Sequence, residues 1–444
     1  MKRLLILIVP LLLALQGARA DNVAQAIWCS GNKTLYFDYC ATVTAGSTYE
    51  GQTITAVYVV NTDTYSGSYP FEDAKAATKV DIKTRFSGFK PKSCYGWFHN
   101  FEQLTEVKGL DNLNTSEVTN MDFMFDTCGE LTELDVSGFY VSKVTTAESM
   151  FNNCTKLKTI YCDNSWSIES TTSMFTGCTA LKGAIAFSDS KVTGTMASPA
   201  GYFTARLTLS DNASNATYLS DWNGWYGDVT LSERTLYKNG YWNTLCLPFD
   251  VTIAGSVLDG GTAKVFDGDN TTLNNGKLTL CFKNAETTIT AGTPFIIKWT
   301  TGDNLVSPTF KGVTIGGSAQ AIASKDGKIQ FAGQFSPFDI TESNISAILY
   351  LGAENKIGYA TEVRKLNSFR AHFEQLPASS SARISSITFV EDGTTAINDV
   401  QWSTDNRQRS INNGQWHTLD GRRLSGMPTA AGVYICNGRK IVIK

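Results

Sequence analysis

The sequence has few of the residues and motifs on which most enzyme chemistry depends. Only three histidines occur in 444 residues, and they stand in three different segments, at His99, His372 and His417, none within an H-E-x-x-H zinc motif. A G-x-S-x-G nucleophile elbow, a phosphate-binding P-loop and a strand-flanked G-x-G-x-x-G are missing as well. We therefore expect no catalytic residues, no metal site and no cofactor, and predict that the protein is not an enzyme.

Charge and long apolar runs are also scarce. Charged residues make up 18% of the chain and the formal net charge is −3, so the composition offers no basic surface for nucleic acid. After the first twenty residues, no apolar run approaches the roughly 20 residues that a membrane-spanning helix needs. The DGDN stretch from Asp267 to Asn270 has calcium-type ligands but lacks the rest of an EF-hand loop, which favours a solvated turn.

Residues 1–20 have the pattern of a secretory signal peptide. Two basic residues precede the apolar run LLILIVPLLLAL, and Ala18, Arg19 and Ala20 form a small-x-small cleavage site. The first cysteine, Cys29, lies well beyond this site, so a lipid-anchoring cysteine at the junction is not expected. We predict an exported protein, either secreted or held at the cell surface.

One short pattern occurs three times, and it is the strongest signal in the chain. The copies align on Met-Phe pairs spaced 26 and 24 residues apart, each followed by Cys three residues later and Leu three residues after that. The repeat residues are Met124, Phe125, Cys128, Leu131, Met150, Phe151, Cys154, Leu157, Met174, Phe175, Cys178 and Leu181. A degenerate earlier copy has Trp97, Phe98, Phe101 and Leu104 at the same places. The period falls within the range of about 20–29 residues of leucine-rich repeats.

Each copy is interpreted as one coil of a solenoid. TNMDFMF carries Met121, Met124 and Phe125 at helical spacing, and LTELDV then alternates apolar and polar residues as a short strand does. A single coil cannot bury its apolar set, so successive coils must stack. The repeated Cys could be a metal ladder, a disulfide series or a small buried residue. We favour the buried residue, because Phe101 replaces Cys in the first copy and C-x2-C pairs are absent.

The repeats need covers at both ends because only three or four coils are present. TLYFDYCATV, ITAVYVV and ATKVDIKTRF predict a β-rich N-terminal cap over residues 21–96. The solenoid is assigned to residues 97–206, and its last, incomplete coil to Gly183–Phe203.

The repeats resemble a known family. NTSEVTNMDFMFDTCGELTELDVSGF is similar to the BspA-like leucine-rich repeats of bacterial surface proteins, and the flanks KTRFSGFKPKSCYGWF and SPAGYF resemble those of that family. The resemblance covers about Ile27 to Phe203 and weakens in the third copy, where CDNSWSIES departs from the pattern. It implies a bacterial cell-surface protein with an adhesive role.

From Leu207 the period disappears and short β-type runs take its place. These runs are WNTLCLPFDV, AKVFDG, KLTLCFK, PFIIKWT, PTFKGVTI, KIQFAGQF, AILYLG, SFRAHFEQL and ISSITFV. Turn-forming residues separate them and no long amphipathic helix interrupts them, so we predict an all-β sandwich over residues 207–392. YWNTLCLPFDV also resembles a β-rich domain that follows such repeats in bacterial surface proteins, and that resemblance implies no activity.

The C-terminal end reads as a linker, residues 393–414, and a short β tail, residues 415–444. The tail is similar to the C-terminal sorting signal of type IX secretion substrates, although it is shorter than such signals usually are. The residues that carry this resemblance include Gly421, Arg422, Gly432, Tyr434, Lys440 and Lys444. It implies that outer-membrane secretion machinery is a partner.

The remaining candidate for function is the outer face of the repeat strands. Outward residues form one ladder of Glu106, Glu133 and Thr159, and a second of Lys108, Asp135 and Tyr161. A mixed polar face with one aromatic suits contact with host extracellular proteins or glycans, and the alternative is an ordinary solvated face.

Together these patterns predict a mainly β protein with short helices, in which a BspA-like leucine-rich-repeat solenoid precedes an all-β, sandwich-like domain. The favoured function is a non-enzymatic secreted or surface protein whose repeats present a binding face to a host protein or glycan. One alternative is a structural or assembly component of the bacterial cell surface. Another is a carbohydrate-active enzyme in the β-sandwich, although no pair of carboxylates stands out for that chemistry.

Overall fold

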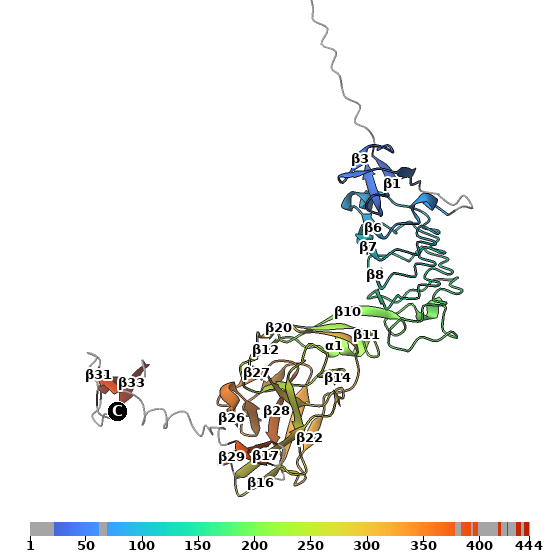
Figure 1. Ribbon diagram of the computed structural model, residues 1–444. Coiled ribbons are helices and arrows are strands. Elements are labelled where there is room, and N and C mark those ends of the chain that lie inside the picture. Colours follow the sequence, from blue (N-terminus) through green and yellow to red (C-terminus); the bar gives the residue numbers. More distant parts are fainter. Residues whose placement is uncertain are drawn as a thin grey trace, which may run out of the picture. The chain divides into compact units, whose positions relative to one another are not determined.

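The computed structural model of the chain describes residues 22–61, 69–377, 383–391, 394–397, 416–418, 424, 432–436 and 439–443. The predicted signal peptide lies outside the described residues, as do Gly421, Arg422 and Lys444 of the predicted sorting tail. Strands dominate the parts that are described, which confirms the predicted mainly β class (Figure 1).

The chain divides into two compact units. The first ends at Arg206 and takes in Trp225–Gly227, and the second contains Leu207–Gly224 and the chain from Asp228 onward. Within the described ranges, no helix has the length and hydropathy needed to cross a bilayer.

The first unit opens with a sheet that changes from antiparallel to parallel pairing. Its strands are β1 (Val23–Cys29), β2 (Thr34–Cys40), β5 (Ala56–Val59), β6 (Lys79–Ile82) and β7 (Glu106–Lys108), in the order β5-β1-β2-β6-β7. A two-strand hairpin, β3 (Thr48–Tyr49) and β4 (Gln52–Thr53), and the 3-10 turns η1 (Glu72–Ala74) and η2 (Thr84–Gly88) accompany it. β1 and β2 are antiparallel, whereas β2, β6 and β7 are parallel. The N-terminal sheet therefore ends in parallel pairing, which is also how the repeat strands β8 and β9 pair.

The repeat copies lie one upon another in parallel register. β8 (Glu133–Asp135) and β9 (Thr159–Tyr161) pair in parallel, and β10 (Phe203–Ser210) continues the ladder beside β9. A second row of parallel bridges joins corresponding residues of successive copies, at Ser93, Asn120, Thr146 and Ser170. The 3-10 turns η3 (Leu110–Asn112) and η4 (Gly194–Met196) lie in the connections. Each copy thus occupies one layer of a stack.

The apolar spacing of TNMDFMF suggested a helical conformation, and this is wrong, because the segment is a succession of turns. From Phe123 to Thr127, every second N–H donates to a carbonyl of the next layer. The donor and acceptor pairs are Phe123 to Glu148, Phe125 to Met150 and Thr127 to Asn152, at 2.9, 2.8 and 2.7 Å. The N–H groups between them bond three residues back within the same layer. An α-helix would use all of these donors internally and leave none for the neighbouring layer.

Two residues in each layer adopt left-handed backbone conformations, two positions before and two positions after the repeat Phe. They are Gly96 and Asn100, Phe123 and Thr127, Ser149 and Asn153, and Ser173 and Gly177, with φ between 51° and 74°. These conformations turn alternate N–H groups toward the next layer. Most of the residues at these positions are not glycine, so their left-handed conformations carry some backbone strain. The hydrogen bonds between layers offset this strain.

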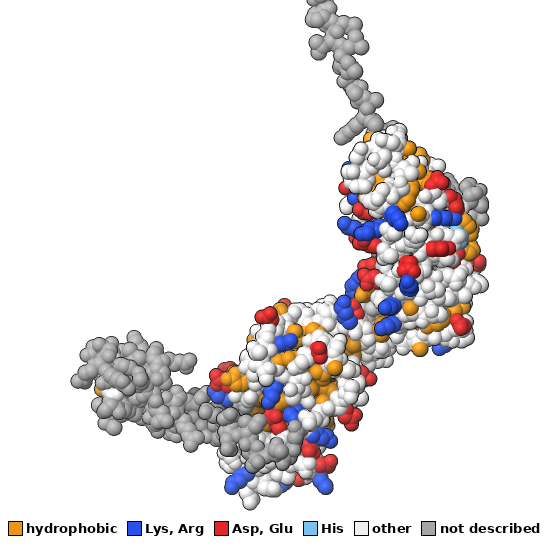
Figure 2. All heavy atoms as spheres, in the orientation of Figure 1, with side chains coloured by type: hydrophobic (Ala, Val, Ile, Leu, Met, Phe, Trp, Pro, Cys, Tyr) orange, Lys and Arg blue, Asp and Glu red, His pale blue; other side chains and the backbone are white. Residues whose placement is uncertain are grey.

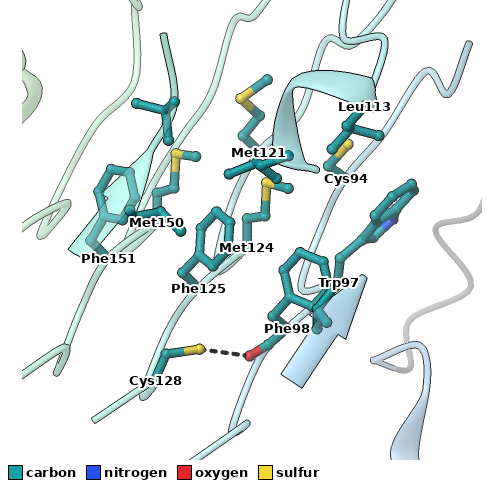
Figure 3. Close-up of a cluster of buried hydrophobic side chains, with 14 of the residues drawn as sticks. Cys94, Trp97, Phe98, Leu113, Met121, Met124, Phe125, Cys128, Met150 and Phe151 are labelled. Atoms are coloured by element: carbon teal, nitrogen blue, oxygen red, sulfur yellow. Dashed lines mark hydrogen bonds between the residues drawn. The ribbon is translucent and has the colours of Figure 1, made fainter. Parts of the chain in front are cut away.

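The repeat Phe rings form a continuous column through the core, and Figure 3 shows Phe98, Phe125 and Phe151 of this column. Centroids of Phe98, Phe125, Phe151 and Phe175 follow one another at 5.2, 5.9 and 5.6 Å, with nearly parallel planes. All four rings are fully buried, as are the repeat Met and Cys side chains beside them. Stacking of like residues therefore supplies the core that one layer alone lacks.

The repeat cysteines link the layers through their thiols. Cys128 donates to the carbonyl of Phe98 at 3.2 Å, the bond drawn in Figure 3. Cys154 and Cys178 repeat the contact to Phe125 and Phe151, at 3.1 and 2.9 Å. Burial raises the pKa of the Cys128 thiol well above its ordinary value, so it stays protonated and able to donate. These three side chains are free thiols in the structure.

The second unit contains two larger sheets that share one hydrophobic core. The first has the order β13-β19-β15-β17-β29-β30 with β16 beside β17, and the second has the order β22-β23-β28-β25-β26. Phe282 of the first sheet meets Phe331 of the second at 5.6 Å between centroids, and Phe331 stacks on Phe373 at 4.7 Å. Apolar residues from both sheets, such as Leu280 and Leu349, belong to one buried cluster.

Every β-type run predicted in this unit contains a strand. The strands of the two sheets are β13 (Asn243–Leu245), β15 (Thr262–Phe266), β16 (Thr272–Asn274), β17 (Lys277–Asn284), β19 (Phe295–Lys298), β22 (Ala321–Ala323), β23 (Ile329–Gln334), β25 (Ile348–Leu351), β26 (Ile357–Tyr359), β28 (Arg370–Gln375), β29 (Ser386–Glu391) and β30 (Thr394–Ile397). Two-stranded sheets use β12 (Thr235–Leu236) with β20 (Leu305–Val306), β14 (Val251–Thr252) with β18 (Thr288–Ile289), and β24 (Phe338–Ile340) with β27 (Arg364–Leu366). The strands β11 (Tyr226–Ser232) and β21 (Thr309–Thr314) belong to the five-stranded sheet of order β21-β11-β10-β9-β8. The sequence did not predict the six-residue helix α1 (Ala216–Asp221) or the 3-10 turn η5 (Ala353–Asn355).

The C-terminal tail contains a small antiparallel sheet of β31 (Trp416–Thr418), β32 (Gly432–Cys436) and β33 (Arg439–Ile443). Gly432 and Tyr434 of the predicted sorting signal lie on β32, and Lys440 lies on β33 opposite Ile435. β30 falls within the stretch predicted as a linker and pairs with β29, whereas residues 398–415 are outside the described part.

Removing one ring from the column should be costly. Phe125→Ala is expected to lower the free energy of unfolding by about 3–5 kcal/mol, because it opens a cavity between two stacked rings. Tyr140→Ala, which removes an aromatic side chain that is 66% exposed, should change it by less than about 0.5 kcal/mol. Urea denaturation monitored by circular dichroism measures both. Similar losses for the two variants would contradict a core built on the Phe column.

Relieving backbone strain at one left-handed position should stabilise the stack. Thr127 is β-branched at a φ of 60°, where the equivalent residues are Asn100, Asn153 and Gly177. Thr127→Gly is expected to raise the free energy of unfolding by about 0.5–1 kcal/mol, since glycine adopts this conformation without steric cost. Thr145→Gly, in the next layer and outside the left-handed set, should lower it by a similar amount. Thermal unfolding of both variants tests the assignment, and a loss for Thr127→Gly counts against it.

Candidate functional site

The predicted ladder residues lie on two separate strand groups. β8 and β9 place Glu133 opposite Thr159 and Asp135 opposite Tyr161, in the order that the sequence predicts. Glu106 and Lys108 lie on β7, whose strand partner is β6 in the other sheet. The central residues Leu134 and Ile160 point into the core, which leaves their neighbours on the outside.

An arginine that the sequence analysis missed completes the β8–β9 group. Arg206, on β10, places Nη1 2.6 Å from Oδ2 of Asp135, and its guanidinium lies 3.9 Å from the centroid of the Tyr161 ring. Its backbone N–H donates to Oδ1 of Asp163 at 2.7 Å. The guanidinium is therefore held by a carboxylate and by the face of an aromatic ring at the same time. The run FTAR, with buried Phe203 and Ala205 and exposed Arg206, could have revealed it.

The carboxylate of Asp135 is fixed by hydrogen bonds from two residues. Its partial burial acts to raise its pKa, but hydrogen bonds from Ser137 and Arg206 outweigh burial and hold the pKa below its usual range. Ser137 donates from its hydroxyl to Oδ1 at 2.5 Å and from its backbone N–H at 3.1 Å. Asp135 is thus ionised at neutral pH and has little freedom to rotate.

The β6–β7 group carries a second set of charges. Lys79 lies 3.2 Å from the carboxylate of Glu106, across the register that pairs the two strands. Lys83 contacts Asp81 at 3.0 Å and Glu50 at 3.4 Å. Lys108, next to Asp81 in register, is exposed and makes no ion pair within the described ranges. Both groups therefore present paired charges of both signs, and Figure 2 shows such side chains intermixed over this unit.

The other residues noted in the sequence are engaged within the fold. Nδ1 of His99 lies 2.9 Å from Oδ2 of Asp126, and the ring stacks on Tyr69 with centroids 3.6 Å apart. His372 is buried, with Nδ1 2.9 Å from Gln334 Oε1 and Nε2 2.9 Å from Glu374 Oε1. The carboxylate of Asp267 accepts the side-chain amide of Asn270 at 2.7 Å, which closes the DGDN turn on itself. Among the residues with described positions, no group of three or more His, Cys, Asp or Glu could hold a metal ion.

The arrangement on β8, β9 and β10 suits binding. It offers a fixed guanidinium, a fixed carboxylate, the edge of Tyr161 and the exposed carboxylate of Glu133 on one face. Tyr and Arg supply much of the binding energy in protein interfaces because they combine apolar area with directed hydrogen bonds.

Comparison with known protein families finds similarity over part of the first unit. Residues 71–191 match the family described as "Mycoplasma protein of unknown function, DUF285". No curated protein and no solved structure matches the chain. The matched residues span the repeat copies and end before Arg206.

The Asp135 contact predicts a pH-dependent contribution to stability. Because the folded pKa of Asp135 is lowered, its contribution is present above the unfolded value of about 3.9 and is lost as pH falls through the folded pKa. Asp135→Asn should therefore lower the free energy of unfolding near pH 6, by no more than about 1 kcal/mol for a half-exposed pair. The difference should vanish near pH 2.

Arg206→Gln provides the control, because it removes one of the two residues whose hydrogen bonds lower the pKa of Asp135. In that background the cost of Asp135→Asn near pH 6 should shrink. Chemical denaturation at a series of pH values measures all four proteins. A cost that is the same at pH 2 and pH 6 would contradict the role assigned to Asp135.

Proposed function

We propose that this chain is a non-enzymatic, exported cell-surface protein whose repeats present a binding face to a host protein or glycan. In this proposal the first unit is a BspA-like leucine-rich-repeat solenoid, and the second is an all-β sandwich. The layered hydrogen bonds and the Phe column support the solenoid. The core shared by two sheets supports the sandwich.

The observation that carries the binding function is the Asp135–Arg206–Tyr161 cluster. These three side chains come from three adjacent strands and hold one another in place before any partner arrives. A partner that docks here has little side-chain entropy to remove, so more of the contact energy appears as affinity. The neighbouring Glu133 and Thr159 extend the polar face and favour a hydrated partner over an apolar one.

Export and surface attachment form the second part of the proposal. Residues 1–20 would direct the chain across the inner membrane, and the tail would engage outer-membrane secretion machinery as a type IX sorting signal. The pairing of β32 with β33 supports a folded tail module around Gly432, Tyr434 and Lys440. The family match over residues 71–191 covers the repeats and leaves their role open.

A binding screen tests the proposed face. The full secreted chain would be applied to immobilised extracellular-matrix proteins and to a glycan array, and the dissociation constant of each hit would be measured by surface plasmon resonance. A Tyr161→Ala/Arg206→Ala variant is expected to raise the dissociation constant at least tenfold, which corresponds to about 1.4 kcal/mol.

The matched control is Tyr140→Ala/Lys143→Ala, which removes an exposed aromatic and an exposed cation from a connecting segment of the same unit. It should change the dissociation constant by less than about twofold. Equal effects of the two double variants would remove the strand face from the interaction. No hit in either screen would overturn the adhesive function and favour a structural role at the cell surface.

A further inference from the structure

The second unit contains a cleft of ≈ 870 Å³ that the proposed function does not use. Its lining includes three arginines, Arg234, Arg364 and Arg370, and four large aromatics, Tyr237, Tyr241, Trp242 and Tyr350. The volume is within the range of about 300–1,000 Å³ typical of sites for small ligands. All of these residues belong to the second unit, so the cleft is independent of the β8–β10 face.

Arg234 is a buried cation that forms no ion pair with the residues that the structure describes. Only 5% of this residue is exposed. Its Nη2 donates to the carbonyl of Thr244 at 2.8 Å, whereas Nε is buried without a hydrogen-bond partner. Burial and the nearby charge of Arg370 lower the pKa of Arg234, while Asp211 acts weakly in the opposite direction. A guanidinium stays protonated at neutral pH, so a buried positive charge lies here, and burial of such a charge is unfavourable unless an anion pairs with it.

The carboxylate of Asp211 attracts Arg234 electrostatically but is hydrogen-bonded to Arg370. Asp211 accepts from Nη1 of Arg370 at 2.5 Å and from Nη2 at 3.1 Å, and Nδ2 of Asn367 donates to it at 3.0 Å. The acidic residue that lines the cleft, Glu354, is paired with Lys356 at 2.7 Å. The lining therefore has more positive than negative charge, and the excess is concentrated around Arg234.

Arg364 is the exposed arginine of the cleft. Its Nη1 donates to the hydroxyl of Tyr350 at 3.0 Å, and its guanidinium lies 5.1 Å from the centroid of that ring. Its ion-pairing capacity is unused by any acid of the described part. An anion entering the cleft would meet this exposed charge before that of the buried Arg234.

Two partly exposed tyrosines line the cleft. Tyr237 is 53% and Tyr241 is 40% exposed. The loop that carries them is fixed by Asn243, which donates to the carbonyl of Tyr237 and accepts its N–H, both at 2.9 Å. The N–H of Trp242 donates to Asn355 at 2.7 Å and ties the loop to the far side of the cleft. Exposed aromatic faces on a rigid loop are suited to flat, partly apolar rings such as the faces of sugars.

We propose that this cleft binds an anionic saccharide, with its carboxylate or sulfate group beside Arg234, Arg364 and Arg370 and a sugar ring against Tyr237 and Tyr241. The arginines supply the charge that selects an acidic ligand over a neutral one. The tyrosines supply the area that selects a saccharide over a bare inorganic anion. This site goes beyond the adhesive face of the repeats, and loss of either one leaves the other intact.

Isothermal titration calorimetry on the full secreted chain tests the ligand class. The probes are a heparin-derived tetrasaccharide, a tetramer of galacturonate, neutral cellotetraose and sodium sulfate. At least one acidic saccharide should bind at low salt and weaken as sodium chloride is added, and cellotetraose should not bind. Absence of acidic-saccharide binding would overturn the proposal, and sulfate binding as tight as the tetrasaccharides would reduce the cleft to a simple anion site.

Paired variants locate the binding. Arg364→Gln should raise the dissociation constant at least tenfold, whereas Lys365→Gln, on the same strand but outside the cleft, should leave it within twofold. Tyr241→Ala should raise it about fivefold, and Tyr218→Ala, an exposed tyrosine on α1, should not. Binding that survives both cleft variants would place the ligand elsewhere.

Arg234→Met separates a binding arginine from a structural one. It removes the buried unpaired charge, so the melting temperature is expected to be unchanged or higher while acidic-saccharide binding falls more than tenfold. A lower melting temperature with binding retained would show that Arg234 serves the fold, and would contradict the proposal.

Discussion

The first unit depends on backbone N–H groups that alternate between hydrogen bonds within a layer and hydrogen bonds to the next layer. In each turn segment, alternate donors close bonds within the layer and the others reach carbonyls of the next layer. Two left-handed residues in every copy make this possible, because they rotate successive peptide groups to opposite sides. The spacing between layers is thus set by the backbone, and the side chains of the core adapt to it. The Phe column and the row of thiols at Cys128, Cys154 and Cys178 follow from this fixed spacing.

The same spacing organises the outer face. Parallel pairing without offset puts Asp135, Tyr161 and then β10 side by side, so that Arg206 can contact both at once. A core of repeated layers and a surface of ordered charges are therefore two results of one register. In the second unit, by contrast, the polar site is a cleft lined by strands and loops that are far apart in sequence. No repeated sequence pattern brings these segments together.

Much of the first unit could be predicted from the sequence because its physics is periodic. The positions of Met124, Phe125, Cys128 and Leu131, and the pairing of Glu133 with Thr159, follow from spacing alone. The conformation of TNMDFMF could not be read in this way. Apolar residues three and four apart also fit a turn whose N–H groups donate to the next layer. A left-handed φ at a residue such as Phe123 cannot be recognised from the residue type.

Long-range contacts account for what the sequence could not predict. Arg206 is separated from Asp135 by the Phe151 and Phe175 copies and by an irregular segment, so no period connects them. The cleft brings Arg234 near Arg370, two residues that nothing in the local sequence relates. Strand positions in the second unit were readable from alternation with turn residues, whereas the order of those strands in two sheets depends on packing that only the folded chain reveals.

The uniform bonding between layers has a consequence for how the array changes in evolution. Each layer donates N–H groups to the next layer and accepts equivalent N–H groups from the layer before it. The copies differ in length by only a few residues. Unequal crossing-over between two copies would insert or delete one whole layer while leaving both junctions matched. The length of the array, and with it the extent of the outer face, is therefore open to change in a single genetic event.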